Sequence, residues 1–171
     1  MGILHEYSDG DTVFEAYIAG IDDCPGPTVL LAHDWSGINA GMRRNAERIA
    51  ELGYTCFALD VYGKGRRGDE PGDNHHLMNR MLEDRAELRR RLLAGLTAAT
   101  EHPSVDSSRI AALGYCFGGL CVLDMARANP ANLKGVIRRA WRAQAAEHRP
   151  AGADRGKRDG AAWLGRPDGA P

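Results

Sequence analysis

A cysteine between two glycines is the feature of this sequence with the clearest chemical potential. Residues 114–118 read Gly-Tyr-Cys-Phe-Gly, which places a glycine two positions away on each side of Cys116. This spacing is typical of a tight turn that exposes a nucleophile at the carboxyl end of a strand. A thiol at a helix N-terminus also lies at the positive end of the helix dipole, which favours the thiolate. The pattern therefore predicts that Cys116 is a nucleophile. The alternative is a small buried hydrophobic residue, as many free cysteines are.

The residues around this motif predict the elements that would position the thiol. Ile110–Leu113 is a short apolar run, typical of a strand covered on both faces, and Leu120–Ala126 continues as an apolar helix. A turn is expected at Asn129–Asn132, followed by another strand that begins at Leu133–Ile137. The motif is thus expected to connect a buried strand to a helix.

Strands and helices also alternate in the preceding part of the chain. Thr28–Ala32 and Tyr54–Leu59 are apolar runs that predict buried strands. Asn39 is a candidate N-cap, and Gly53 a candidate C-terminal glycine, of an amphipathic helix between them. His75–Thr100 predicts one long amphipathic helix.

This alternation predicts an α/β fold with a mostly parallel sheet and helices on both faces. His5–Gly20 predicts one or two edge strands with a turn at Ser8–Asp11. The polar loop His33–Gly37 follows a predicted strand at its carboxyl end, where α/β sheets place their chemistry.

The composition limits the classes of partner. The chain has 171 residues, enough for one domain, and its formal net charge of −1 gives no reason to expect nucleic acid or an anionic membrane. We expect no secretory signal and no membrane span. The four cysteines have neither metal-ligand nor C-x-x-C spacing, so a reduced, cytoplasmic protein without a metal is predicted.

Three stretches resemble the dienelactone hydrolase family of α/β-hydrolases. They are His-Asp-Trp-Ser-Gly-Ile-Asn at 33–39, Leu-Asp-Val-Tyr-Gly at 59–63 and Gly-Tyr-Cys-Phe-Gly-Gly at 114–119. The resemblance runs from about Tyr7 to Ile137 and implies a partial α/β-hydrolase fold over residues 1–137 that lacks the last strands. It also implies hydrolysis of a small-molecule ester or lactone by a Cys-His-Asp triad, with no cofactor. It gives no oligomeric state.

The resemblance assigns roles to individual residues. Cys116 matches the nucleophile, and the backbone N–H groups of Phe117 and Trp35 match the two donors of the oxyanion hole. Asp34 stands where many members place a glutamate that contacts the resting thiol. The alternative is that Asp34 orders its own loop through an Asx turn. The glycines of the elbow are Gly114, Gly118 and Gly119.

The segment 138–171 differs from the rest of the chain. It has no Val, Ile, Phe, Tyr, Met or Cys, and its large apolar residues are Trp141, Trp163 and Leu164. Such a composition cannot supply buried strands, so a disordered tail is predicted. A basic tail that binds nucleic acid is disfavoured because acidic residues interrupt the positive charge.

A shifted reading frame would explain this change in composition. Codons compatible with Ala162–Ala170, read one base later, encode His-Gly-Trp-Asp-Asp-Pro-Met-Ala, which resembles the family's stretch around the triad aspartate. One extra base near the codons for Val136–Arg139 would produce the shift. The nucleotide sequence over Asn129–Pro171 tests this hypothesis, and stop codons in the shifted frame would contradict it.

The triad aspartate and histidine are not found in this chain. His148 lies in a segment that offers no scaffold to orient it. Three functional hypotheses therefore stay open. The first is a hydrolase with Cys116 as nucleophile, and the second is a truncated, non-catalytic fragment. The third and weaker one is a redox-sensing domain that uses Cys116.

Overall fold

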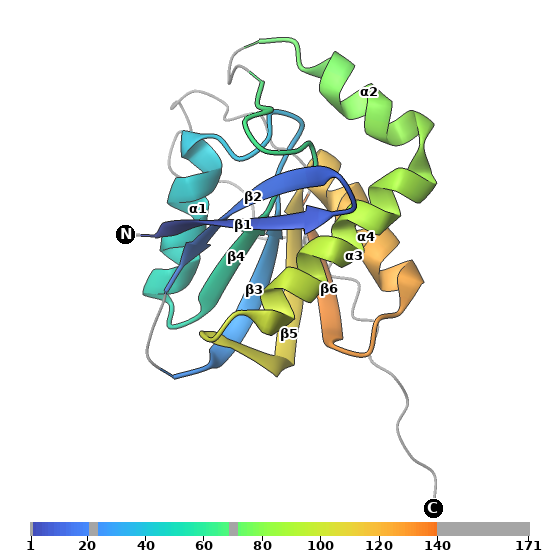
Figure 1. Ribbon diagram of the computed structural model, residues 1–171. Helices are drawn as coiled ribbons and strands as arrows, with labels where there is room; N and C mark the ends of the chain where they lie inside the picture. Colours follow the sequence, from blue (N-terminus) through green and yellow to red (C-terminus); the bar gives the residue numbers. More distant parts are fainter. Residues whose placement is uncertain (1, 21–23, 69–71, 140–171) are drawn as a thin grey trace, which may run out of the picture.

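The computed structural model describes residues 2–20, 24–68 and 72–139, which form one sheet with helices packed against it (Figure 1). None of the helices in these ranges is long and apolar enough to cross a membrane. The elements in chain order are β1 (Ile3–Asp9), β2 (Thr12–Ala19), β3 (Gly26–Ala32), α1 (Ala40–Glu51), β4 (Thr55–Leu59), α2 (His75–Glu83), α3 (Arg85–Glu101), β5 (Val105–Tyr115), α4 (Phe117–Ala128) and β6 (Leu133–Arg139).

The strand order is β1-β2-β4-β3-β5-β6. The neighbours β4/β3, β3/β5 and β5/β6 are parallel, whereas β1/β2 and β2/β4 are antiparallel. The prediction of a mostly parallel sheet is therefore confirmed. The predicted turn within Ser8–Asp11 connects β1 to β2. Of the one or two edge strands predicted there, only β1 lies at the edge, because Tyr17–Ala19 of β2 pairs with β4.

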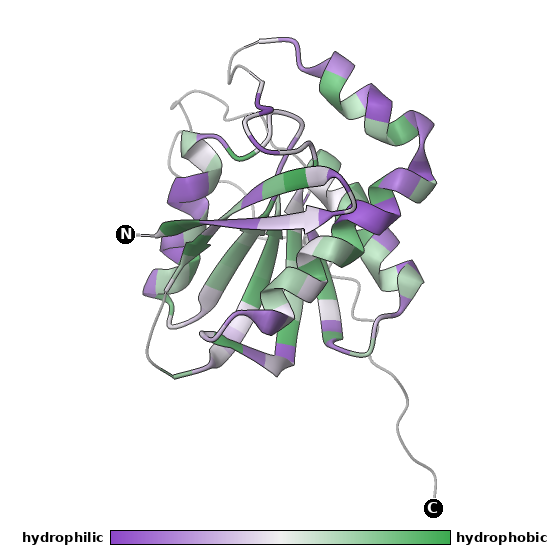
Figure 2. Cartoon of the chain, in the orientation of Figure 1, coloured by the Kyte–Doolittle hydropathy of each residue, from purple (hydrophilic) through white to green (hydrophobic). Residues whose placement is uncertain are grey.

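The central strands are buried on both faces, and successive residues alternate between two cores. Phe57 and Leu59 pack against the side that α3 and α4 cover, whereas Cys56 and Ala58 pack towards α1. Figure 2 shows the consequence, with the inner strands largely green and purple residues gathered on helices such as α1 and α2. This burial fixes the strand register, because a slip of one residue would exchange the two sets of side chains.

The helix caps follow the sequence in α1. The Asn39 side chain accepts a hydrogen bond from the Met42 N–H at 2.8 Å, and Gly53 follows the helix with φ of +89°. Both predicted ends of this helix are confirmed. The positive φ requires glycine because a side chain at that position would be strained.

The single long helix predicted over His75–Thr100 is wrong, because the chain breaks at Asp84. This residue has φ −118° and ψ 86°, and its carboxylate accepts from the Glu87 N–H at 2.8 Å to cap α3. An aspartate followed three residues later by a glutamate is the sequence signature of a helix start. The apolar stripe continues through both helices and therefore hid the signal.

The last strand extends beyond the predicted domain boundary. β6 includes Arg138 and Arg139, which pair with Gly114 and Tyr115 of β5. The tail predicted to begin at residue 138 therefore begins no earlier than residue 140. The rest of that prediction falls on residues 140–171, outside the described residues, and stays a prediction.

A buried arginine ties α3 to the loop that follows β4. Arg91 is only 3% exposed, and its Nη1 donates to the carbonyl oxygens of Val61 and Tyr62 at 2.8 and 3.2 Å. Its Nη2 pairs with Glu87, and the guanidinium lies 5.4 Å from the centre of the Phe14 ring. The Arg91 Nε atom has no hydrogen-bond partner among the described residues. The buried Arg91 guanidinium thus connects the loop after β4 to α3.

We expect Arg91→Met to lower the free energy of unfolding by about 3 kcal/mol, because it leaves a carboxylate and two buried carbonyl groups without their donor. Urea denaturation measures the change. The matched control is Arg89→Met, which removes an exposed arginine from the same helix and should change stability by less than about 0.5 kcal/mol. Equal effects of the two variants would contradict a structural role for the buried cation.

Candidate active site

Cys116 forms the whole connection between β5 and α4. β5 ends at Tyr115 and α4 begins at Phe117. Cys116 has φ 52° and ψ −114°, and its side chain is exposed. The predicted strand, tight turn and helix are therefore confirmed, and the alternative of a buried Cys116 is wrong. Its role as a nucleophile stays a prediction.

Two other cysteines show what burial does to a thiol. Cys56 and Cys121 are fully buried, and burial raises the pKa of each thiol well above its ordinary value. They remain protonated and act as small apolar residues. Cys116 differs because it is open to solvent at the N-terminus of a twelve-residue helix.

Glycine is required at two positions of the turn because backbone segments approach closely there. A Cβ at Gly114 would lie 2.0 Å from the Gly118 carbonyl oxygen, and a Cβ at Gly118 would lie 2.2 Å from that of Ala32. At Gly119 the nearest atom belongs to the flexible side chain of Arg138, at 2.7 Å. The first turn of α4 therefore packs directly on β3 and β5, which aims residue 116 at the carboxyl edge of the sheet.

The two predicted oxyanion donors emerge at that same edge. β3 and β5 are parallel neighbours whose last paired residues are Ala32 and Gly114. Trp35 and Phe117 each lie three residues beyond that pair. Within the described ranges, neither of their backbone N–H groups makes a hydrogen bond. Their role as the donors of an oxyanion hole stays a prediction.

The loop after β3 contains the Asx turn considered for Asp34. Asp34 Oδ1 accepts hydrogen bonds from the Ser36 N–H at 2.9 Å and from the Ser36 hydroxyl at 2.5 Å. In the described part of the chain these are the hydrogen bonds of the carboxylate, and none reaches Cys116. The loop-ordering interpretation is thus confirmed by contacts. The contact with the thiol stays a prediction.

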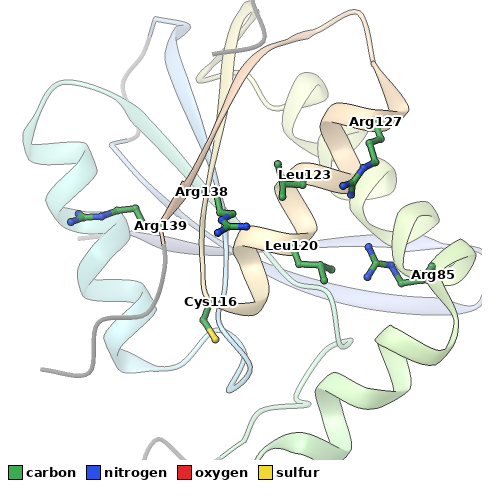
Figure 3. A pocket seen from close by; sticks show the side chains of 7 residues that line it. All are labelled: Arg85, Cys116, Leu120, Leu123, Arg127, Arg138 and Arg139. Carbon is green, nitrogen blue, oxygen red and sulfur yellow. The ribbon is translucent and has the colours of Figure 1, made fainter. Parts of the chain in front are cut away.

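A cavity of about 430 Å³ opens beside Cys116 (Figure 3). Leu120 and Leu123 of α4 form an apolar strip in it, and four arginines contribute to the lining, of which Arg139 directs its side chain away from the leucines (Figure 3). Two of the arginines also form ion pairs with Asp124, which holds them in place. Sequence reasoning missed this cationic lining, because its members come from three elements. They are Arg85 of α3, Arg127 of α4, and Arg138 and Arg139 of β6.

His33 is a further residue of the site that sequence reasoning left without a role. It is fully buried directly after β3. Its Nε2 accepts a hydrogen bond from the Val61 N–H at 3.2 Å, and its Nδ1 lies 2.5 Å from the backbone carbonyl oxygen of Asp34. Burial lowers the pKa of His33, so the imidazole is neutral. His33 lies in the first of the three family-like stretches, which was the only available signal.

The burial of histidines predicts acid destabilisation. The pKa of His33 is lowered by its burial, and that of His102 by its burial and by the nearby charge of His5. Both folded pKa values lie below the unfolded value of about 6.5, so the unfolded chain binds more protons on acidification. We expect the urea midpoint to fall between pH 7.5 and 5.5. The fall should be smaller in His102→Asn, which keeps an acceptor for the Ser104 N–H. A midpoint that rises at pH 5.5 would contradict this.

The thiol has no partner for proton transfer among the described residues. No histidine or aspartate in these ranges hydrogen-bonds to Cys116. Both ring nitrogens of His33 already contact backbone groups, those of Asp34 and Val61. His148 and the stretch 162–170, on which the frameshift hypothesis depends, lie outside the described residues. The predicted absence of triad partners therefore stays a prediction for the chain as a whole.

Comparisons with known proteins match most of the chain. The family model described as the dienelactone hydrolase family matches residues 14–141. A putative carboxymethylenebutenolidase of Aquifex aeolicus is 29% identical over 134 residues, which cover 76% of this chain and 57% of that protein. The carboxymethylenebutenolidase of Pseudomonas putida is 26% identical over 144 residues, covering 81% of this chain and 58% of its own length.

Solved structures give the same picture. A dienelactone hydrolase-like promiscuous phosphotriesterase from metagenomic libraries superposes with a TM-score of 0.73 at 31% identity. The match covers 82% of this chain and 58% of that one. A putative dienelactone hydrolase from Klebsiella pneumoniae, at 24% identity and a TM-score of 0.61, shares the fold. The chain thus spans just over half the length of these relatives.

Proposed function

The chain belongs to the dienelactone hydrolase family, and we propose that it cleaves a lactone or carboxylic ester with Cys116 as the nucleophile. The observation that carries this proposal is the placement of an exposed cysteine as the sole residue between β5 and α4. Cys116 lies at the N-terminus of α4, the positive end of the helix dipole. The backbone N–H groups of Trp35 and Phe117 have no partners among the described residues and can donate to an oxyanion.

The proposed reaction begins with attack of the thiolate on the carbonyl carbon. A C–S bond forms, and the π electrons of the carbonyl group move to its oxygen, which accepts hydrogen bonds from the N–H groups of Trp35 and Phe117. The C=O bond then re-forms as the C–O bond breaks, and the released alkoxide takes a proton from solvent water. Water must cleave the resulting thioester with the help of a base, which returns the thiolate and releases the acid.

The cavity beside Cys116 favours a particular kind of substrate. Leu120 and Leu123 can contact an apolar part of a small molecule. The arginines near them, Arg85, Arg127 and Arg138, can pair with a negatively charged group (Figure 3). We therefore propose a small anionic ester or lactone. The relatives from Aquifex aeolicus and Pseudomonas putida carry names of lactone hydrolases, which agrees with this class. A cytoplasmic location stays a prediction.

One observation favours a second candidate. Because no described histidine or aspartate contacts the thiol, the chain can form a thioester at Cys116 and release it slowly. In that case it is a protein that is acylated once and does not turn over, as expected for a fragment without its triad.

A single assay separates these functions. The purified chain is mixed with p-nitrophenyl acetate and with an unsaturated lactone, and nitrophenolate release and intact mass are followed over time. Steady turnover supports the hydrolase. One equivalent of product with an acetyl group on Cys116 supports the second candidate. Neither reaction, with an unmodified Cys116, would contradict both. Oxidation of Cys116 by peroxide without acylation would favour the redox hypothesis.

A further inference from the structure

The loop that carries the Trp35 N–H is held by two side chains on consecutive peptide groups. The first of these peptide groups joins Asp34 to Trp35 and contains both the Asp34 carbonyl and the Trp35 N–H. His33 Nδ1 lies 2.5 Å from that carbonyl oxygen. Because a trans peptide is planar, its N–H points away from its C=O. A bond to the carbonyl oxygen therefore fixes the direction of the Trp35 N–H.

The hydrogen-bond partners of His33 define its tautomer. The Val61 N–H can only donate, so His33 Nε2, at 3.2 Å, must accept and carries no proton. The Asp34 carbonyl oxygen can only accept, so Nδ1 must donate. The buried ring is thus a neutral imidazole with its proton on Nδ1, and it connects the loop after β3 to the loop after β4.

Tyr62 holds the next peptide group. Its hydroxyl donates to the Trp35 carbonyl oxygen at 2.9 Å. Its ring packs on His33, with centroids 4.7 Å apart, and stacks on Phe117 at 5.9 Å and 16°. Burial raises the pKa of Tyr62, so the hydroxyl stays a donor. The ring of Tyr62 therefore contacts Phe117, which is one of the two donor residues, and His33, which holds the loop that carries the other donor.

We propose that His33 and Tyr62 are positioning residues, which hold the Trp35 N–H in the orientation that serves an oxyanion together with the Phe117 N–H. This inference rests on the proposed function of Cys116. Neither side chain touches the reacting atoms. Both act through the backbone of the loop, one on each peptide group flanking Trp35.

The test compares two reactions of the same thiol in the Cys24→Ser background, which removes the other exposed cysteine. Acylation by p-nitrophenyl acetate passes through an oxyanion, whereas alkylation by iodoacetamide does not. Peptide mass spectrometry measures both rates at Cys116. The variant is Tyr62→Phe. The matched control is Tyr7→Phe, which removes a similar hydrogen bond, from a tyrosine hydroxyl to the Asp60 carbonyl oxygen at 2.7 Å.

We expect Tyr62→Phe to slow acylation about tenfold, because a loosened donor loses part of its effect on the transition state, and to leave alkylation unchanged. Tyr7→Phe should leave both rates unchanged. An unchanged ratio of acylation to alkylation in Tyr62→Phe would overturn the positioning role of that residue alone. Acylation of the parent chain no faster than that of its Cys116→Ala form would instead overturn the proposed function.

A second measurement requires no variant and tests His33. Long-range ¹H–¹⁵N correlation spectra distinguish the tautomers of an imidazole ring. We expect the His33 pattern of a proton on Nδ1 and a bare Nε2, constant from pH 6 to 8. A proton on Nε2 would overturn the positioning role of His33, because its contact with the Asp34 carbonyl would then lack a hydrogen.

Discussion

Cys116→Ala should remove all acylation by p-nitrophenyl esters above the background of the other thiols. The expected loss is at least about a thousandfold, because Cys24, the other exposed cysteine, lies outside the turn between β5 and α4. The fold should survive, since the side chain at this position is open to solvent. Nitrophenolate release and intact mass measure the loss, and circular dichroism checks the fold.

Cys116→Ser sharpens this test. A hydroxyl is not ionised near neutral pH and needs a base to attack, and no described histidine contacts this position. We therefore expect the serine variant to be as inactive as the alanine variant. The matched control is Cys24→Ala, which removes an exposed thiol outside the turn and should keep full acylation. Retained activity in both Cys116 variants would assign the chemistry to another residue.

Gly118→Ala should have the largest effect on stability, about 4 kcal/mol or more. The added methyl group would lie 2.2 Å from the Ala32 carbonyl oxygen and 2.6 Å from that of His33. Both atoms belong to the backbone and cannot move without separating α4 from β3. Since domains of this size are stable by about 5–15 kcal/mol, much of the protein should unfold at moderate urea. Urea denaturation followed by circular dichroism measures the shift.

Gly135→Ala is the control for this prediction. Gly135 lies in β6, its φ is not positive, and a Cβ there would have no atom within 4 Å. The same added methyl group should therefore leave stability unchanged or raise it slightly, because alanine restricts the unfolded chain. Equal midpoints for the two variants would show that the close approach at the turn carries little energy.

The sequence allowed prediction of those features that depend on local spacing. The strand before Cys116, the turn and the helix after it follow from a short apolar run, two glycines and a second apolar run within about twenty residues. The capping roles of Asn39 and Gly53 could be predicted for the same reason, because a capping residue lies next to the helix that it ends. The mostly parallel sheet followed from the alternation of such elements.

Features that depend on distant partners could not be predicted. Arg91 reads as one more charged residue on a helix, and only the loop after β4 makes it a buried donor. His33 and Tyr62 are far apart in the chain, so no spacing reveals that their rings pack together. The break at Asp84 is the exception, since its signature was present and the continuous apolar stripe outweighed it.

The backbone at residue 116 places selection for stability and selection for reactivity in opposition. A side chain at φ 52° is penalised by roughly 1–2 kcal/mol relative to glycine, which adopts this conformation freely. Selection for stability alone would thus favour glycine at position 116, because an exposed sulfur contributes no packing energy that would offset the strain. A cysteine at such a position is tolerated where its thiol is used, so the unfavourable dihedral angle is itself an argument for chemistry at that atom.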